Sequence, residues 1–122
     1  MLSICIVNWN TKELLREALQ AIVQFPPAEE YEVIVVDNAS ADGSAAMVAE
    51  EFSQVKLIAN QANLLYAKAN NQALVAAKGD LLLLLNPDVR VKAECLIRLC
   101  AYLRSHPEAA AVAPRLVFPD GR

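Results

Sequence analysis

Short hydrophobic runs alternate with segments of helical periodicity along the chain. The runs at 2–7, 32–36, 55–59, 81–85 and 109–112 predict five β-strands. Between them, hydrophobic residues recur every three or four positions, which predicts four helices. Strands that are apolar throughout are typical of a parallel sheet covered on both faces. The pattern therefore predicts an α/β fold, with an open, mainly parallel sheet and helices on both of its faces.

Polar and turn-forming residues predict where the helices begin and end. Asn10, with Glu13 three positions later, matches a capping box and predicts the start of the first helix. Ser40 or Asp42 is expected to cap the second helix. Gly79 is expected to end the third.

The most apolar run, Leu81 to Leu85, consists of five consecutive leucines and is followed by Asn86-Pro87-Asp88. It predicts a central strand buried on both faces. Pro87 cannot donate a ladder hydrogen bond, so pairing is expected to stop there. Asp88 then projects from the end of this strand.

Composition narrows the class of protein. The chain has 122 residues, of which 56% are hydrophobic, so we expect one domain, residues 1–122, with a real core. The run of five leucines is far shorter than the roughly 20 residues of a membrane helix, and no signal peptide is expected at the start. A soluble, cytoplasmic domain is predicted. The net charge of −3, without a basic stripe, argues against a nucleic-acid partner.

In open parallel sheets, ligands bind beyond the carboxyl ends of the strands. Polar residues follow four of the predicted strands, at Asn8-Trp9-Asn10, Asp37-Asn38-Ala39-Ser40, 60–63 and 86–88. This edge of the sheet is the candidate site. Turns and helix caps use the same residue types, so capping is the preferred explanation for Asn10, Ser40 and Asp42.

Asp37 and Asp88 differ because each comes directly after a buried strand, where a carboxylate needs water, a donor or a cation. A functional role is favoured for both. Asn70, on the apolar face of the third helix, is equally compatible with a structural hydrogen bond and with a ligand contact. Lys68 is more simply a solvated helix residue, although a phosphate is the alternative partner.

Only three glycines are present, and neither a dinucleotide-binding fingerprint nor a phosphate-binding P-loop occurs. A bound nucleotide diphosphate would therefore need another source of positive charge. Asp88 holding Mn²⁺ or Mg²⁺ would supply it, because these ions commonly take one or two carboxylates together with phosphate oxygens.

Four segments, in this order, resemble the family 2 glycosyltransferases: "SICIVNWNTKELLREALQAI", "EVIVVDNASADGSAAMV", "NLLYAKANNQAL" and "GDLLLLLNPDV". The resemblance extends over nearly the whole chain and is greatest to the bacterial rhamnosyltransferase-like branch. It implies the GT-A fold, a Rossmann-like nucleotide-binding domain. It also implies inverting transfer of a sugar from a nucleotide diphosphate (UDP or dTDP type) to a hydroxyl of a glycan or lipid-linked acceptor.

The resemblance also assigns roles to residues. Asp37 would contact the base or ribose, the segment from Asn8 to Asn10 would line the base pocket, and Asp88 would bind the metal. Asn86 stands in place of the family's first acid. The full set of expected substrate-binding residues is Asn8, Trp9, Asn10, Asp37, Asn38, Lys68, Asn70 and Asn86, with Asp88 as metal ligand and Mn²⁺ or Mg²⁺ as cofactor.

Two departures from the family pattern bear on activity. Leu65 stands where the family usually has a glycine, and leucine does not easily adopt a positive φ. The family's catalytic base, an Asp or Glu of the acceptor-binding half, has no recognisable counterpart before Arg122. We therefore expect a donor-binding fragment, inactive alone, in the cytoplasm or at the inner face of the membrane through its acceptor.

Two alternatives remain. One is a degenerate, non-catalytic nucleotide-binding or interaction module of the same fold, which the leucine at position 65 favours. The other is a nucleotidyltransferase acting on sugar phosphates, which is disfavoured because the chain lacks a glycine-rich, basic loop after the first strand.

Overall fold

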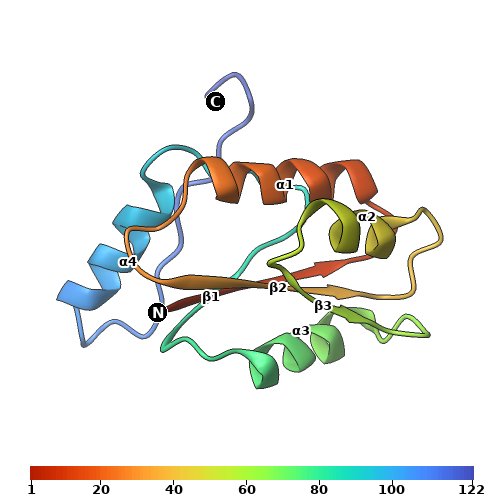
Figure 1. The fold of residues 1–122 in the computed structure, drawn as a ribbon. Helices are drawn as coiled ribbons and strands as arrows, with labels where there is room; N and C mark the ends of the chain where they lie inside the picture. Colours follow the sequence, from red (N-terminus) through yellow and green to blue (C-terminus); the bar gives the residue numbers. More distant parts are fainter.

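A computed structural model describes all 122 residues and contains four strands and four helices (Figure 1). In chain order the elements are β1 (Leu2–Asn8), α1 (Lys12–Gln24), β2 (Tyr31–Asp37), α2 (Ser44–Glu51), β3 (Lys56–Ala59), α3 (Leu65–Ala76), β4 (Leu81–Leu84) and α4 (Cys95–Ser105). The strands are parallel and lie in the order β3-β2-β1-β4. The predicted α/β fold is confirmed. None of the helices combines the length and apolar character needed to span a membrane.

Helices cover the two faces of the sheet unequally. α1 and α2 lie on one face and α3 on the other (Figure 1). The larger core cluster joins inward residues of β1 and β2 to α1, α2 and α4, and the smaller one packs Ala69 and Ala73 of α3 against Cys5, Ile34 and Val36. β1 and β2, which occupy the middle of the sheet, are therefore buried on both faces, as their sequences predict.

β4 is an edge strand, so the prediction of a central strand at the five leucines is wrong. It pairs with β1 alone, in the register Ser3↔Leu82 and Cys5↔Leu84. Leu82 and Leu84 lie on the α3 face of the sheet, yet they are 51% and 49% exposed because α3 covers β1 and β2. A run of leucines indicates the capacity to be buried on two faces, and here only one face of β4 is covered.

The predicted fifth strand at 109–112 is not formed. Residues after α4 follow an extended path without joining the sheet. Val112 helps to line a small apolar pocket with leucines of β4 and α4. The three alanines at 109–111 offer little apolar surface, and only Ala109 and Val112 of this segment are half-buried.

The capping box predicted at Asn10 is absent. Asn10 has φ +53°, and α1 begins at Lys12, whose backbone N–H donates to Oδ2 of Asp42 at 2.9 Å. Glu13 binds Arg16 instead of capping the helix. The cap position of α2 is Gly43, at φ +84°, so the expectation that Ser40 or Asp42 occupies it is wrong. Oδ1 of Asp42 nevertheless accepts the backbone N–H of Ser44, the first residue of α2, at 3.0 Å.

Gly79 does not cap α3. The helix ends at Ala76 and the chain then becomes extended. A Cβ at position 79 would lie 2.5 Å from the carbonyl oxygen of Met1 and 2.8 Å from the amide nitrogen of Ser3. Gly79 is therefore needed for the close approach of the α3–β4 connection to β1.

Candidate functional site

The carboxyl ends of β1 and β2 are joined by a buried hydrogen-bonded centre. Asn8 and Asp37 are paired in the strand register and are 0% and 2% exposed. Nδ2 of Asn8 donates to Oδ1 of Asp37 at 2.9 Å. Ser40 adds its hydroxyl to Oδ1 at 2.6 Å and its backbone N–H to Oδ2 at 3.0 Å. The Thr11 hydroxyl donates to Oδ1 of Asn8 at 2.6 Å. The Asp37 carboxylate thus accepts three hydrogen bonds and is held rigidly.

Further contacts lock the loops that follow these two strands to each other. The backbone N–H of Asn10 donates to the Ser40 hydroxyl at 2.9 Å, and Oδ1 of Asn10 accepts the N–H of Ala41 at 2.8 Å. Asp42 bridges the starts of α1 and α2. Burial raises the pKa of Asp42, but hydrogen bonds from Ser44 and from the N–H of Lys12 outweigh it and lower the pKa overall.

Asn38 fixes the turn that leads into α3. It is 2% exposed, and its Nδ2 donates to the carbonyl oxygen of Leu65 at 3.3 Å. Its Oδ1 accepts Nδ2 of Asn60 at 3.1 Å and the N–H of Leu64 at 3.3 Å. Asn60 is itself held by Gln72 of α3. This network extends the preorganised edge from β2 to β3 and α3.

Strained backbone is concentrated at the same edge. Asn10, Ala39 and Leu65 have φ values of +53°, +60° and +65° and follow β1, β2 and β3 respectively. Such conformations cost of order 1–3 kcal/mol each for residues other than glycine and persist only where the surroundings impose them. Leu65 is also 73% exposed, so it gains little from burial. The position flagged in the sequence does adopt the conformation that favours glycine.

The segment after β4 is open by comparison. Asn86 and Asp88 are exposed, and the Asp88 carboxylate makes no hydrogen bond or ion pair within the chain. Oδ1 of Asn86 accepts the hydroxyl of Tyr66 at 3.3 Å. No group of three or more His, Cys, Asp or Glu residues comes together as a metal cage. A cation at Asp88 would therefore take most of its ligands from a bound phosphate or from water.

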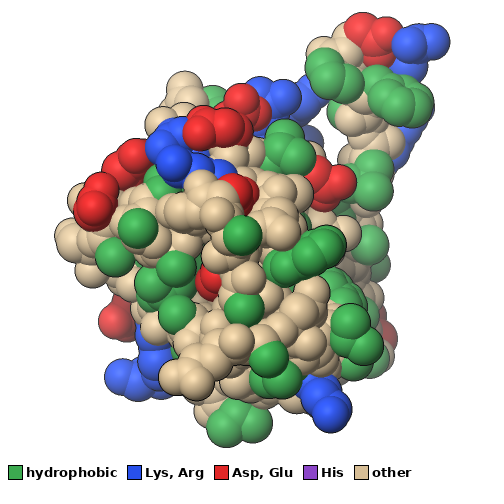
Figure 2. Space-filling model, turned by 90° about the vertical axis from the view of Figure 1, so that its right-hand side faces the viewer, with side chains coloured by type: hydrophobic (Ala, Val, Ile, Leu, Met, Phe, Trp, Pro, Cys, Tyr) green, Lys and Arg blue, Asp and Glu red, His purple; other side chains and the backbone are tan.

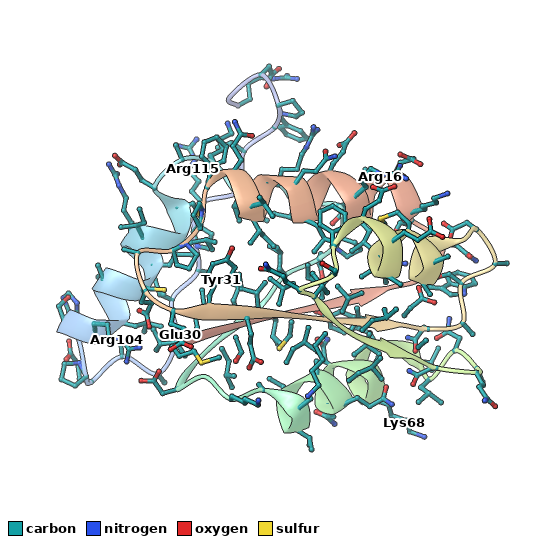
Figure 3. All side chains as sticks on the ribbon, in the orientation of Figure 1. Arg16, Glu30, Tyr31, Lys68, Arg104 and Arg115 are labelled. Carbon is teal, nitrogen blue, oxygen red and sulfur yellow. The ribbon has the colours of Figure 1, made fainter.

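The remaining expected residues are placed as follows. Trp9 is 55% exposed beside the buried centre. Lys68 is exposed and projects from α3 away from the sheet (Figure 3). Asn70 is 6% exposed, and its buried Nδ2 has no hydrogen-bond partner. Figure 2 looks onto this edge, where the charged side chains gather over α1 and α2 and the middle of the face is largely uncharged.

The structure therefore brings together Asn8, Asn10, Asp37 and Asn38, and it leaves Lys68 apart from them. Residues outside the expected set also contribute to the contacts, among them Thr11, Ser40, Asp42, Asn60 and Tyr66. Their position after strands or at a helix start was the available signal. Tyr66 lies in the first turn of α3 and is 54% exposed.

The cysteines do not add a nucleophile to the site. All three are free, and Cys5 and Cys100 are buried. Burial raises the pKa of the Cys5 thiol to about 11, with a smaller contribution from Glu32. The reactive thiolate form of Cys5 is therefore scarce at neutral pH, and Cys5 and Cys100 fill space in the core.

Comparison with protein families decides which class of protein carries this site. The model of glycosyl transferase family 2 matches residues 3–122. The chain belongs to this family. The fold and family expected from the four sequence segments are confirmed, and the rhamnosyltransferase-like branch stays a prediction.

Two curated relatives carry glycosyltransferase names. The uncharacterized glycosyltransferase YfnE of Bacillus subtilis is 37% identical over 71% of this chain and 23% of its own length. Poly(ribitol-phosphate) β-glucosyltransferase of Bacillus spizizenii is 32% identical over 80% of this chain and 16% of its own length. The family 2 chain thus spans between 14% and 38% of the length of the curated relatives it matches.

Solved structures share the fold. TarS of S. aureus (residues 1–349) superposes with a TM-score of 0.77 at 25% identity, covering 87% of this chain and 33% of the TarS chain. TarS has also been solved with UDP and with UDP-GlcNAc. The mannosyltransferase PcManGT of Pyrobaculum calidifontis, in complex with GDP-Man and Mn²⁺, gives a TM-score of 0.76 at 28% identity over 84% of this chain and 32% of its own.

Proposed function

We propose that this family 2 chain is the donor-binding domain of an inverting glycosyltransferase. It binds a nucleotide-diphosphate sugar together with a divalent cation, Mn²⁺ or Mg²⁺. The sugar is then transferred to the hydroxyl of a glycan or lipid-linked acceptor at the cytoplasmic side of the membrane.

One observation carries the proposal. Asp37 and Asn8 are the last residues of β2 and β1, and Asp88 lies in the turn after β4; these are three neighbouring strands of a parallel sheet. A ligand beyond the carboxyl ends of these strands meets all three segments. The family's nucleotide-sugar-bound relatives, TarS and PcManGT, have the same fold and support this choice of ligand.

Different residues would contact different parts of the ligand. Asp37 and Asn8, held by Ser40 and Thr11, would face the nucleoside, with Trp9 available for stacking on the base. Asp88 would hold the cation against the diphosphate. Its single free carboxylate fits an ion that keeps phosphate and water oxygens as its other ligands.

The reaction that follows from this binding mode is a direct displacement. A base removes the proton of the acceptor hydroxyl, whose oxygen attacks the anomeric carbon and expels the nucleoside diphosphate, inverting the configuration. The bound cation stabilises the charge that develops on the leaving diphosphate. Residues 1–122 provide the donor half of this arrangement, and we place the base in an acceptor-binding part of the enzyme.

A second candidate is favoured by one observation, the strained and exposed Leu65 at the edge of the site. A bulky residue where the backbone prefers glycine is what a family member that has lost donor binding would tolerate. The second candidate is therefore a non-catalytic nucleotide-binding or interaction module of the same fold.

Calorimetric titration with UDP, dTDP and GDP, each with and without Mn²⁺, tests the main proposal. We expect one of the three nucleotides to bind more tightly with Mn²⁺ than without it. Asp88→Ala should abolish that metal-dependent gain without weakening metal-free binding. Glu108→Ala, which removes another exposed carboxylate, is the matched control. Binding by none of the nucleotides would favour the interaction module, and a gain that survives in Asp88→Ala would remove the metal role from this residue.

A further inference from the structure

The turn after β4 makes a single side-chain hydrogen bond with the rest of the protein. Asn86, Pro87 and Asp88 leave the sheet at its edge, and the backbone bond from Val89 N–H to the Asn86 carbonyl closes the turn at 3.2 Å. The one hydrogen bond that links a side chain of this turn to the rest of the protein runs from the Tyr66 hydroxyl to Oδ1 of Asn86. Tyr66 lies in the first turn of α3, which packs on β1 and β2.

In the structure this contact engages the oxygen end of the Asn86 amide. An asparagine side chain has an acceptor oxygen and a donor nitrogen at its two ends. Because Oδ1 accepts the Tyr66 hydroxyl, Nδ2 is the end left for other partners, and it makes no hydrogen bond within the chain. Asn86 is exposed at the candidate site, so its two N–H donors are available to a ligand.

The neighbouring charges suit a donor at this position. Asp88, two residues further on, is an unpaired carboxylate and would repel a diphosphate that arrived without a cation. An amide nitrogen beside it attracts phosphate oxygens without adding to the negative charge. A free amide could turn its oxygen toward the phosphate instead, which would forfeit this interaction.

We propose that Tyr66 is a positioning residue that fixes the Asn86 amide so that Nδ2 donates to a phosphate oxygen of the nucleotide diphosphate. The proposal rests on the proposed donor-binding function and deepens it. The diphosphate is then recognised by the carboxylate of Asp88, through its cation, and by the amide nitrogen of Asn86. Tyr66 affects binding only through Asn86.

Binding of UDP and of UMP in Mn²⁺, measured by calorimetry, tests this role in the wild type, Tyr66→Phe, Asn86→Ala and the double variant. If UDP is not the preferred base, the diphosphate and monophosphate of the preferred nucleoside take their place. We expect Tyr66→Phe to weaken diphosphate binding about three- to tenfold, as the loss of one oriented hydrogen bond would. The affinity of Tyr66→Phe for the monophosphate should differ from that of the wild type by less than about twofold.

The double variant separates positioning from structure. Asn86→Ala and the double variant should bind the diphosphate equally, because the Tyr66 hydroxyl has nothing to orient once the amide is gone. Tyr102→Phe removes a tyrosine hydroxyl on α4 that makes no hydrogen bond and is the control. All variants should melt within about 2 °C of the wild type, as surface substitutions do.

Two results would overturn this inference and leave the proposed function standing. One is additivity, in which the double variant binds the diphosphate more weakly than Asn86→Ala. The other is an equal loss of monophosphate and diphosphate affinity in Tyr66→Phe, which would indicate a general disturbance of α3. Failure of the wild type to bind any nucleoside diphosphate would instead overturn the proposed function and this inference with it.

Discussion

The two halves of the candidate site are built differently. At the ends of β1 and β2, Asn8 and Asp37 are buried and satisfied by neighbouring side chains and backbone. At the end of β4, Asn86 and Asp88 are exposed, and one long hydrogen bond is the only side-chain hydrogen bond of the turn. The first half is preorganised by the fold, whereas the second has groups whose partners would come with a ligand. A nucleoside would therefore meet a rigid surface, and a diphosphate with its cation would complete an open one.

The largest expected effect is a difference in stability between variants of the two carboxylates, Asp37 and Asp88. Asp37→Ala removes the acceptor of three hydrogen bonds, one from the buried Asn8 and two from the half-buried Ser40. We expect the free energy of unfolding to fall by about 2–4 kcal/mol. Asp88→Ala should change it by less than about 0.5 kcal/mol, because that carboxylate has no partner to lose.

Chemical denaturation in urea, analysed by linear extrapolation, measures both variants on one scale. Asp37→Asn is the informative intermediate, since an amide oxygen can still accept from Ser40. Equal destabilisation by Asp37→Ala and Asp88→Ala would contradict the division of the site into a rigid and an open half.

The turn between β3 and α3 gives a second, smaller test. Leu65 is held at φ +65° by Asn63 Oδ1, which accepts its N–H at 2.8 Å, and by Asn38, which donates to its carbonyl. Leu65→Gly relieves the strain of the left-handed conformation and loses little burial. After the extra entropy of glycine in the unfolded chain is subtracted, we expect a gain of about 0.5–1 kcal/mol in the free energy of unfolding.

Val75→Gly, at an exposed position of the same helix without a positive φ, is the control for glycine itself. It should destabilise the chain by several tenths of a kcal/mol. Nucleotide titration of Leu65→Gly then distinguishes the two candidate functions. Tighter binding than in the wild type would show that the leucine obstructs the donor site, and unchanged binding would show that it does not.

The comparison also shows which parts of the fold are encoded locally. The spans of β1 and β2 are within a residue or two of those predicted, because residues buried on both faces leave an unbroken apolar run. The same argument failed for β4, where Leu82 and Leu84 have no covering element. An apolar run shows that a strand can be buried, and whether it is depends on elements elsewhere in the chain.

The candidate site was predictable only in part for a related reason. Its residues could be located by the rule that ligands meet the carboxyl ends of parallel strands. Their partners could not, because the contacts join positions far apart in sequence. Asn10 looks like a helix cap beside Glu13, yet its partners are Ser40 and Ala41, about 30 residues away. The roles of individual residues toward a ligand stay predictions.

The smallest effect concerns the pH dependence of the rigid half. Hydrogen bonds at Asp42 lower its pKa below the ordinary value of 3.8 despite the opposing effect of burial. A carboxyl group whose pKa is lower in the folded state stabilises that state above its unfolded pKa, and the contribution is lost as the pH falls through the folded value. The free energy of unfolding should therefore be level near neutral pH and decline below about pH 4. The pKa values of Glu32, Glu29 and Asp80 are also lowered, so these residues contribute to the same decline.

Asp42→Asn tests the share of this decline that belongs to the locked loops. Asparagine keeps one acceptor oxygen but has no charge to lose, so the difference between the urea midpoints at pH 7 and pH 3 should be smaller than in the wild type. Glu50→Gln removes a charge from an exposed position of α2 that takes part in no hydrogen bond or ion pair, and it is the matched control. An Asp42→Asn variant with the full acid dependence of the wild type would mean that these hydrogen bonds do not favour the charged carboxylate. The rigidity of the β1 and β2 half would then rest on Asp37 and Asn10 with their partners.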